Sequence, residues 1–202
     1  MNFQVLTPFS RTRNIIELGD CLKRQGVTWH LLCVEGENKL PDLGSWIHQW
    51  FFAPPPEGFF IGHHLVNQFL DRVGVVDDDY YIVLTDDDFT EEGFFKKLEA
   101  YNDDIIVVSM KRSNKPTGAD AGCPFGNLMA CPENMKTCHV GYEQAIIKGK
   151  VAKQYRCEGV YHADGLLLEK LWAERMESFR FVPDAFVYFN YLFPGRTGRW
   201  DR

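Results

Sequence analysis

The sequence predicts an α/β protein with a mostly parallel central sheet flanked by helices. Apolar segments typical of buried strands alternate with amphipathic segments typical of helices through residues 1–110. This alternation favours parallel strands joined by crossover helices. The chain has 202 residues, which suffice for one good core and leave no room for two full-sized domains. We therefore expect a single domain over residues 1–202.

The N-terminal segment predicts a strand, a helix and a second strand. FQVLTPF, residues 3–9, is the first strand. The helix that follows can be capped by Ser10 or Thr12, shows apolar residues on one face, and ends at Gly26. TWHLLCVE, residues 28–35, is mostly apolar, as expected for a strand that is covered on both faces of a sheet.

The next segment continues the alternation. A short strand is expected around residues 50–53, before prolines that force a loop. Apolar residues at four-residue intervals predict an amphipathic helix over residues 61–73. The strand YYIVLT, residues 80–85, is followed by three aspartates and by a helix that Thr90 would cap. A strand over residues 104–110 completes the pattern.

The second half of the chain is less regular. Residues 111–141 are rich in Gly, Pro, Asn and Cys, which predicts a long functional loop with little secondary structure. An apolar stretch over residues 143–155 comes next, followed by a helix that starts just after Asp164. A last strand is expected over residues 181–193.

Composition and charge argue against several classes of protein. Hydrophobic residues make up 45% of the chain and charged residues 25%, which is ordinary for a soluble globular protein. The net charge is -6 and the basic residues form no stripe, so no nucleic acid partner is expected. The opening MNFQVLTPF has neither a basic region nor a long apolar run, so we expect no signal peptide, no transmembrane segment and a cytoplasmic protein.

The six cysteines do not suggest a disulfide scaffold in a chain of this size, and we expect reduced thiols. Cys123, Cys131, Cys138 and His139 could be imagined as a zinc site. Their intervals lack the short paired spacing of zinc ribbons and fingers, so zinc is disfavoured.

Three consecutive aspartates, Asp86, Asp87 and Asp88, end the strand over residues 80–85. Because alternate residues of a strand share a side, Asp86 and Asp88 can converge. Ligands of α/β sheets bind beyond the carboxyl ends of the strands, which is where this cluster falls. Neighbouring carboxylates repel one another by ~1 kcal/mol or more per pair, and a bound cation would relieve that repulsion.

Oxygen ligands favour Mg²⁺ or Mn²⁺ over zinc. Such an ion on one or two carboxylates usually completes its shell with substrate phosphates, which indicates a nucleotide or a nucleotide sugar. The alternative is an acidic, solvated loop that merely starts a helix. For the earlier acidic run over residues 77–79, which precedes its strand at the opposite edge of the sheet, the loop interpretation is favoured.

Taken together, these segments resemble the inverting glycosyltransferases of the GT-A fold over most of the chain. Residues 7–35 are similar to the first strand, helix and strand of family 2 enzymes and of glucuronyltransferases. VLTDDDF resembles the metal-binding DxD segment, and GHHLVNQFL resembles the helix before it. EQAIIKGKV followed by ADGLLLEKL is similar to the segment that carries an acidic general base at the start of a helix.

The resemblance implies a single GT-A, Rossmann-like domain, in which residues 1–110 bind the nucleotide sugar and residues 111–202 bind the acceptor. Asp88 would be the principal metal ligand, while Asp86 and Asp87 would serve the metal, the ribose or the donor sugar.

Asp164 aligns with the catalytic base of the family, and a carboxylate at a helix N-terminus stays ionised and rigidly placed. Two alternatives are that Asp164 is a simple helix cap and that Asp184 is the base.

The resemblance also implies a donor pocket at the ends of the first two strands. Its expected residues are Thr7, Pro8, Arg11 and Glu35. Glu35 stands where the family usually has an aspartate. Asn190 stands near the place of a histidine that often serves the metal or the diphosphate. Arg196 or Arg199 could clamp the diphosphate as a forked donor, or could belong to a solvated tail.

The sequence therefore predicts a metal-dependent inverting glycosyltransferase that moves a sugar from a nucleotide sugar, with a UDP-sugar as the leading donor, to a hydroxyl acceptor. Mn²⁺ or Mg²⁺ is the expected cofactor, and a glycan, a small molecule or a protein the acceptor. The alternatives are a nucleotidyltransferase and a non-catalytic carbohydrate- or partner-binding domain. His63 and His64 are expected at the surface or in packing, because the sequence shows no partner for them.

Overall fold

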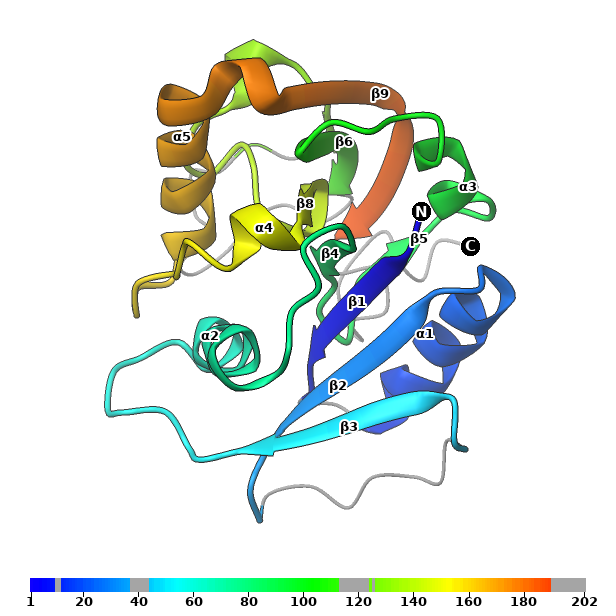
Figure 1. Cartoon of the computed structure of the whole chain (residues 1–202), viewed down its shortest axis with the longest axis vertical. Helices are drawn as coiled ribbons and strands as arrows, with labels where there is room; N and C mark the ends of the chain where they lie inside the picture. The colour runs from blue at the N-terminus through cyan, green and yellow to red at the C-terminus, as the bar shows by residue number, and fades with distance from the viewer. Residues whose placement is uncertain (10–11, 37–43, 113–123, 125, 190–202) are drawn as a thin grey trace.

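Helices cover both faces of one central sheet (Figure 1). The computed structural model describes residues 1–9, 12–36, 44–112, 124 and 126–189. It confirms the predicted α/β class with a sheet flanked by helices. Among the described residues, no helix has both the length and the apolar character needed to cross a lipid bilayer.

The first half of the chain forms four parallel strands. They are β1 (Phe3–Pro8), β2 (Thr28–Val34), β3 (Ile47–Phe52) and β4 (Tyr80–Val83). Helix α1 (Thr12–Arg24) joins β1 to β2, and α2 (Ile61–Arg72) joins β3 to β4. β1 lies between β2 and β4, and β3 pairs with the outer side of β2. These elements confirm the predicted ones, because their apolar periodicity is a local property of the sequence.

The second half adds strands that run in both directions. Its elements are β5 (Phe89–Thr90), α3 (Phe94–Leu98), β6 (Ile105–Arg112), β7 (Gly126–Leu128), β8 (Ala145–Lys148), α4 (Gly149–Ala152), α5 (Ala163–Arg175) and β9 (Phe179–Phe189). Short 3₁₀ turns span Pro132–Asn134, Tyr142–Gln144 and Met176–Ser178. The sheet order is β3-β2-β1-β4-β8-β6-β9-β5, with β7 paired to the end of β6. β8 is antiparallel to both β4 and β6, so the sheet is parallel in its first half and mixed as a whole.

Two predicted details differ from the structure. Thr90 does not cap a helix, because it lies in β5 and pairs with Val187 of β9. The helix instead begins at Phe94, after Gly93, whose φ of 72° is a left-handed conformation that glycine adopts without strain. The segment 111–141, expected to be irregular, contains β7, which pairs with backbone groups at the end of β6.

Two apolar layers hold the sheet, one on each face. The layer under α1 and α3 contains Ile15, Leu18 and Leu22, the face predicted for α1, and all three are fully buried. The layer under α2, α4 and α5 contains Leu65 and Phe69. Burial of a large apolar side chain contributes about 1.5–3 kcal/mol. The two layers thereby fix the positions of the loops at the ends of the strands.

His30 of β2 is buried as a neutral imidazole. The Trp50 Nε1–H donates to His30 Nδ1 at 3.0 Å, so the ring proton lies on Nε2, which donates to Gln4 Oε1 at 2.8 Å. Burial, with a smaller effect of the neighbouring His48, lowers the pKa of His30 from 6.5 to about 4. Protonation at Nδ1 would break the hydrogen bond from Trp50.

We expect acid to destabilise the fold through His30. Below about pH 6.5 the unfolded chain binds a proton at this residue, whereas the folded chain binds it only near pH 4. The free energy of unfolding should fall by about 3 kcal/mol across this window from this group alone. Urea unfolding near neutral pH and near the lower end of the window measures the fall. The variant His30→Gln should show a weaker pH dependence, and an equal dependence in both proteins would contradict the prediction.

Candidate active site

The aspartate cluster forms a tight turn after β4. Asp88 is fully buried, and its Oδ2 accepts a hydrogen bond from the Thr85 N–H at 2.8 Å. The Thr85 hydroxyl lies 2.6 Å from Asp88 Oδ2 and 2.8 Å from Asp87 Oδ1. Asp88 therefore closes the turn from inside, whereas Asp86 and Asp87 line the neighbouring cavity. The role of Asp88 as principal metal ligand stays a prediction.

A cavity of about 380 Å³ lies at the carboxyl ends of β1 and β4. Its lining includes Pro8 from β1, Asp86 and Asp87 from the turn after β4, His63 from α2 and Asp164 from α5. Open α/β sheets bind their ligands at this end of the strands. The structure thus brings the predicted base and two of the predicted acidic residues to one site.

Asp164 is the second residue of α5, and its carboxylate is held by a different segment. Its Oδ2 accepts a hydrogen bond from the Tyr142 N–H at 3.2 Å. The residue at the N-cap position is His162. The alternative interpretation of Asp164 as a simple helix cap is therefore wrong. Its side chain is 21% exposed, so a ligand in the cavity can reach it.

His63 lies beside Asp164, a neighbour that the sequence did not predict. Its Nε2 lies 3.9 Å from Asp164 Oδ1, and its Nδ1 lies 3.2 Å from Val160 O. Burial lowers the pKa of His63, although the nearby Asp164 carboxylate acts in the opposite direction. The expected packing role is seen for His63, which is buried against the rings of Phe60 and Tyr142, and its side chain also lines the cavity. The expected surface role is seen for His64, which bonds Ala53 O.

Glu143 is a buried carboxyl group of the cavity that sequence reasoning missed. A Cβ atom at Gly141 would lie 2.5 Å from Glu143 Oε2 and 3.0 Å from Asp164 Oδ2, so glycine allows both groups to approach this point. Burial, followed by repulsion from Asp88 and Asp164, raises the pKa of Glu143 well above its ordinary value. The protonated form is therefore more strongly favoured for Glu143 than for an exposed glutamate. The available signal was a single acidic residue at the head of the apolar segment EQAII.

Several residues predicted for the site lie elsewhere. The hydroxyl of Thr7 accepts a hydrogen bond from Trp29 Nε1–H at 2.9 Å inside the core. Glu35 is exposed after β2 and does not line the cavity. Asp184 is exposed at an irregularity of β9, away from the cavity, so the structure does not place it as a base. The predicted residues outside the described part of the chain are Arg11, Asn190, Arg196 and Arg199.

Among the described residues, no group of three or more His, Cys, Asp or Glu side chains could hold a metal ion. Cys131, Cys138 and His139 therefore form no such group, and Cys123 lies outside the described part of the chain. Asp86 and Asp87 nevertheless suit a hard cation. They are 1% and 2% exposed beside the cavity, and Mg²⁺ usually takes one or two carboxylates together with substrate phosphates.

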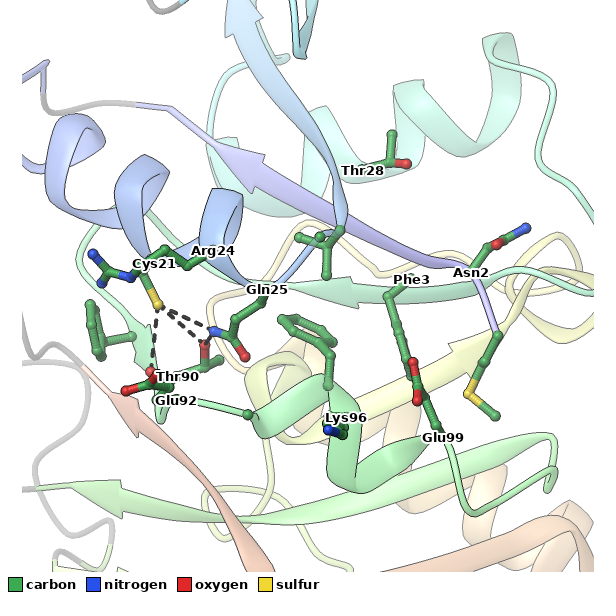
Figure 2. A pocket seen from close by; sticks show the side chains of 16 residues that line it. Asn2, Phe3, Cys21, Arg24, Gln25, Thr28, Thr90, Glu92, Lys96 and Glu99 are labelled. Carbon is green, nitrogen blue, oxygen red and sulfur yellow. Dashed lines mark hydrogen bonds between the residues drawn. The ribbon is translucent and has the colours of Figure 1, made fainter.

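A second hollow, of about 670 Å³, lies between α1 and α3 (Figure 2). In its wall the Gln25 amide donates to Thr90 Oγ1 at 2.9 Å and to Cys21 Sγ at 3.3 Å. Its lining includes Phe3 and Thr28, the first residues of β1 and β2. It therefore faces the amino ends of these strands, away from Asp164, and we place the candidate active site in the smaller cavity.

Comparison with solved structures identifies two proteins of similar fold. Residues 1–349 of TarS from S. aureus match with a TM-score of 0.64 and 15% identity, over 93% of this chain and 60% of that one. The same protein in complex with UDP matches with a TM-score of 0.62 and 14% identity, over 93% of this chain and 60% of that one. The inositol-1-phosphate CTP transferase from T. maritima gives 0.52 and 10%, over 93% of this chain and 88% of that one.

These similarities show that the chain has a GT-A-like α/β fold, as the sequence resemblance implied. The chain spans only 60% of the length of the TarS chain that it matches. No family model matches it, and no curated protein matches its sequence. The fold and the site together define a GT-A-like α/β domain with an acidic cavity at the carboxyl ends of its strands.

Proposed function

We propose that the chain transfers a glycosyl group from a nucleotide sugar to a hydroxyl acceptor, with inversion at the anomeric carbon. The observation that carries the proposal is the one cavity that joins Asp164 to Asp86 and Asp87. A base and a carboxylate-rich seat for a metal diphosphate are the two parts that such a transfer needs. The fold similarity to TarS solved with UDP supports testing a uridine nucleotide first.

Asp164 is the general base in this proposal. Its place in the first turn of α5 presents the carboxylate from a rigid element at the cavity. The bond from the Tyr142 N–H fixes its direction. The carboxylate takes the proton of the acceptor hydroxyl while that oxygen bonds to the anomeric carbon and the bond from this carbon to the diphosphate breaks. A single displacement of this kind inverts the configuration.

Asp86 and Asp87 would hold Mg²⁺ or Mn²⁺ in this proposal. When bound, the ion would neutralise negative charge that develops on the leaving diphosphate. Asp88 keeps the two carboxylates in place, because its bonds to Thr85 fix the turn that carries them.

A nucleotidyltransferase is the second candidate. The T. maritima CTP transferase matches 88% of its own length, a larger share than TarS. Such an enzyme would use the same acidic turn and would release pyrophosphate from a nucleoside triphosphate. A domain that only binds a carbohydrate or a partner would release neither product.

Ligand binding and product release test the proposal together. Thermal unfolding is measured with UDP-, GDP- and CDP-sugars, with and without Mn²⁺. A ligand at 100 times its Kd stabilises the native state by about 2.7 kcal/mol, which raises the Tm of a chain of this size by roughly 5–10 °C. We expect this shift with one nucleotide sugar, together with release of the free nucleoside diphosphate. Pyrophosphate release would favour the nucleotidyltransferase, and a shift without turnover would favour the binding domain.

A further inference from the structure

Arg112 is the last residue of β6, and it lines the cavity that contains Asp164. It is only 8% exposed. Its guanidinium carbon lies 4.6 Å from the centroid of the ring of Phe189, the residue paired with it on β9. An aromatic ring covers one face of a guanidinium group and leaves its N–H edges for hydrogen bonds. Sequence reasoning placed Arg112 in an irregular loop and gave it no role.

Arg112 has few hydrogen-bond acceptors among the described residues. Its Nη1 donates one long hydrogen bond, of 3.5 Å, to Pro124 O. Its Nε is buried and has no acceptor in the described part of the chain. The charge lowers the pKa of Glu143, but burial and the neighbouring Asp88 and Asp164 outweigh this effect and raise it. A buried guanidinium with so few partners is costly, and an anion in the cavity would relieve that cost.

The aspartates of the cavity repel an anion. They line it from two segments, as Asp86 and Asp87 in the turn after β4 and as Asp164 in α5. Arg112 is the only arginine or lysine among the described lining residues. A phosphate that enters the cavity therefore has one fixed protein cation to contact. The fork of a guanidinium matches two phosphate oxygens, which the single ammonium of lysine cannot do.

We propose that Arg112 binds the diphosphate of the nucleotide-sugar donor and stabilises it as the leaving group. This inference rests on the proposed function, because it names the residue that contacts the donor of that reaction. This is the role for which the sequence offers Arg196 or Arg199, both of which lie outside the described residues. Phe189 acts as the platform that holds the guanidinium in a fixed plane.

Calorimetric titration of UDP and of uridine, both in Mn²⁺, tests the inference. Arg112→Gln should lower the affinity for UDP by about 10- to 100-fold, because hydrogen bonds to a charged group are lost. Its affinity for uridine should stay within about twofold of the wild type, since uridine has no phosphate. Arg112→Lys should show a smaller loss for UDP. Arg180→Gln is the matched control, because Arg180 is exposed and pairs with Asp103 outside the cavity.

The outcomes separate this inference from the proposed function. Equal UDP affinity in the wild type and Arg112→Gln would overturn the role of Arg112 while leaving the function intact. An equal loss of affinity for UDP and for uridine in Arg112→Gln would overturn it too. If the wild type binds no UDP, the proposed donor is wrong, and inorganic pyrophosphate becomes the probe. If the wild type binds pyrophosphate and Arg112→Gln does not, the inference of an anion site at Arg112 is supported. If neither protein binds pyrophosphate, that inference is refuted. If Arg112→Gln does not fold, Arg112→Lys decides by the same comparison.

Discussion

With Asp164 replaced by asparagine, glycosyl transfer should slow by about 100- to 10,000-fold, which is the range that a positioned general base contributes. The protein should stay folded and should still bind the donor nucleotide. Asparagine keeps the size of the side chain, and its amide oxygen can accept the hydrogen bond that the Tyr142 N–H donates. It cannot take a proton from the acceptor hydroxyl. Release of nucleoside diphosphate gives the rate, and titration of UDP gives the affinity.

Asp184→Asn is the control for this experiment. It makes the same chemical change at an exposed carboxylate of β9 that does not line the cavity. Its rate should equal that of the wild type. Wild-type turnover by Asp164→Asn would refute the assignment of the base. Loss of activity in Asp184→Asn alone would transfer that role to Asp184.

Removal of two carboxylates from the turn after β4 should abolish metal-dependent nucleotide binding. In the double variant Asp86→Asn, Asp87→Asn, the affinity for UDP in Mn²⁺ should fall by about 100-fold or more, because the charged oxygen ligands of the cation are lost. The affinity for UDP without a divalent ion should change much less. Both carboxylates line the cavity and are almost fully buried, and opposite charges attract each other more strongly there than at an exposed surface. Titrations with Mn²⁺ and with EDTA measure the difference.

The matched control is the double variant Asp77→Asn, Asp78→Asn. It also removes two negative charges from an acidic run, but these two residues are exposed and precede β4 instead of following it. Its UDP affinity should be unchanged in both titrations. Equal metal dependence in the wild type and in Asp86→Asn, Asp87→Asn would show that the cation, if one is used, binds elsewhere.

The first half of the fold was predictable because its signals are local. The strands β1, β2 and β4 are apolar runs bounded by turn residues, and α1 and α2 carry their apolar residues at helical intervals. Parallel pairing then follows from the alternation of strands and helices. The position of the acidic turn at a carboxyl end of the sheet needed no further information.

The second half depended on contacts between distant segments. The sequence of β8 does not predict that this strand pairs antiparallel with both β4 and β6. The residue type of Thr90 is typical of a helix cap, yet Thr90 pairs with β9 as part of a strand. Here tertiary contacts override local propensity. The sheet edge that β5 completes exists only after β9 has folded onto β6.

By itself, the sequence determined the α/β class, the acidic turn with Asp86 and Asp87, and the helix that presents Asp164. Only the tertiary structure decided that His63, Glu143 and Arg112 meet these carboxylates in one cavity. Residue type and periodicity show which face of an element is apolar, whereas the cavity is formed where α2, β6 and the turn before β8 pack together. The burial that raises the pKa of Glu143 and leaves Arg112 Nε without an acceptor among the described residues arises from that packing, and no local sequence pattern predicts it.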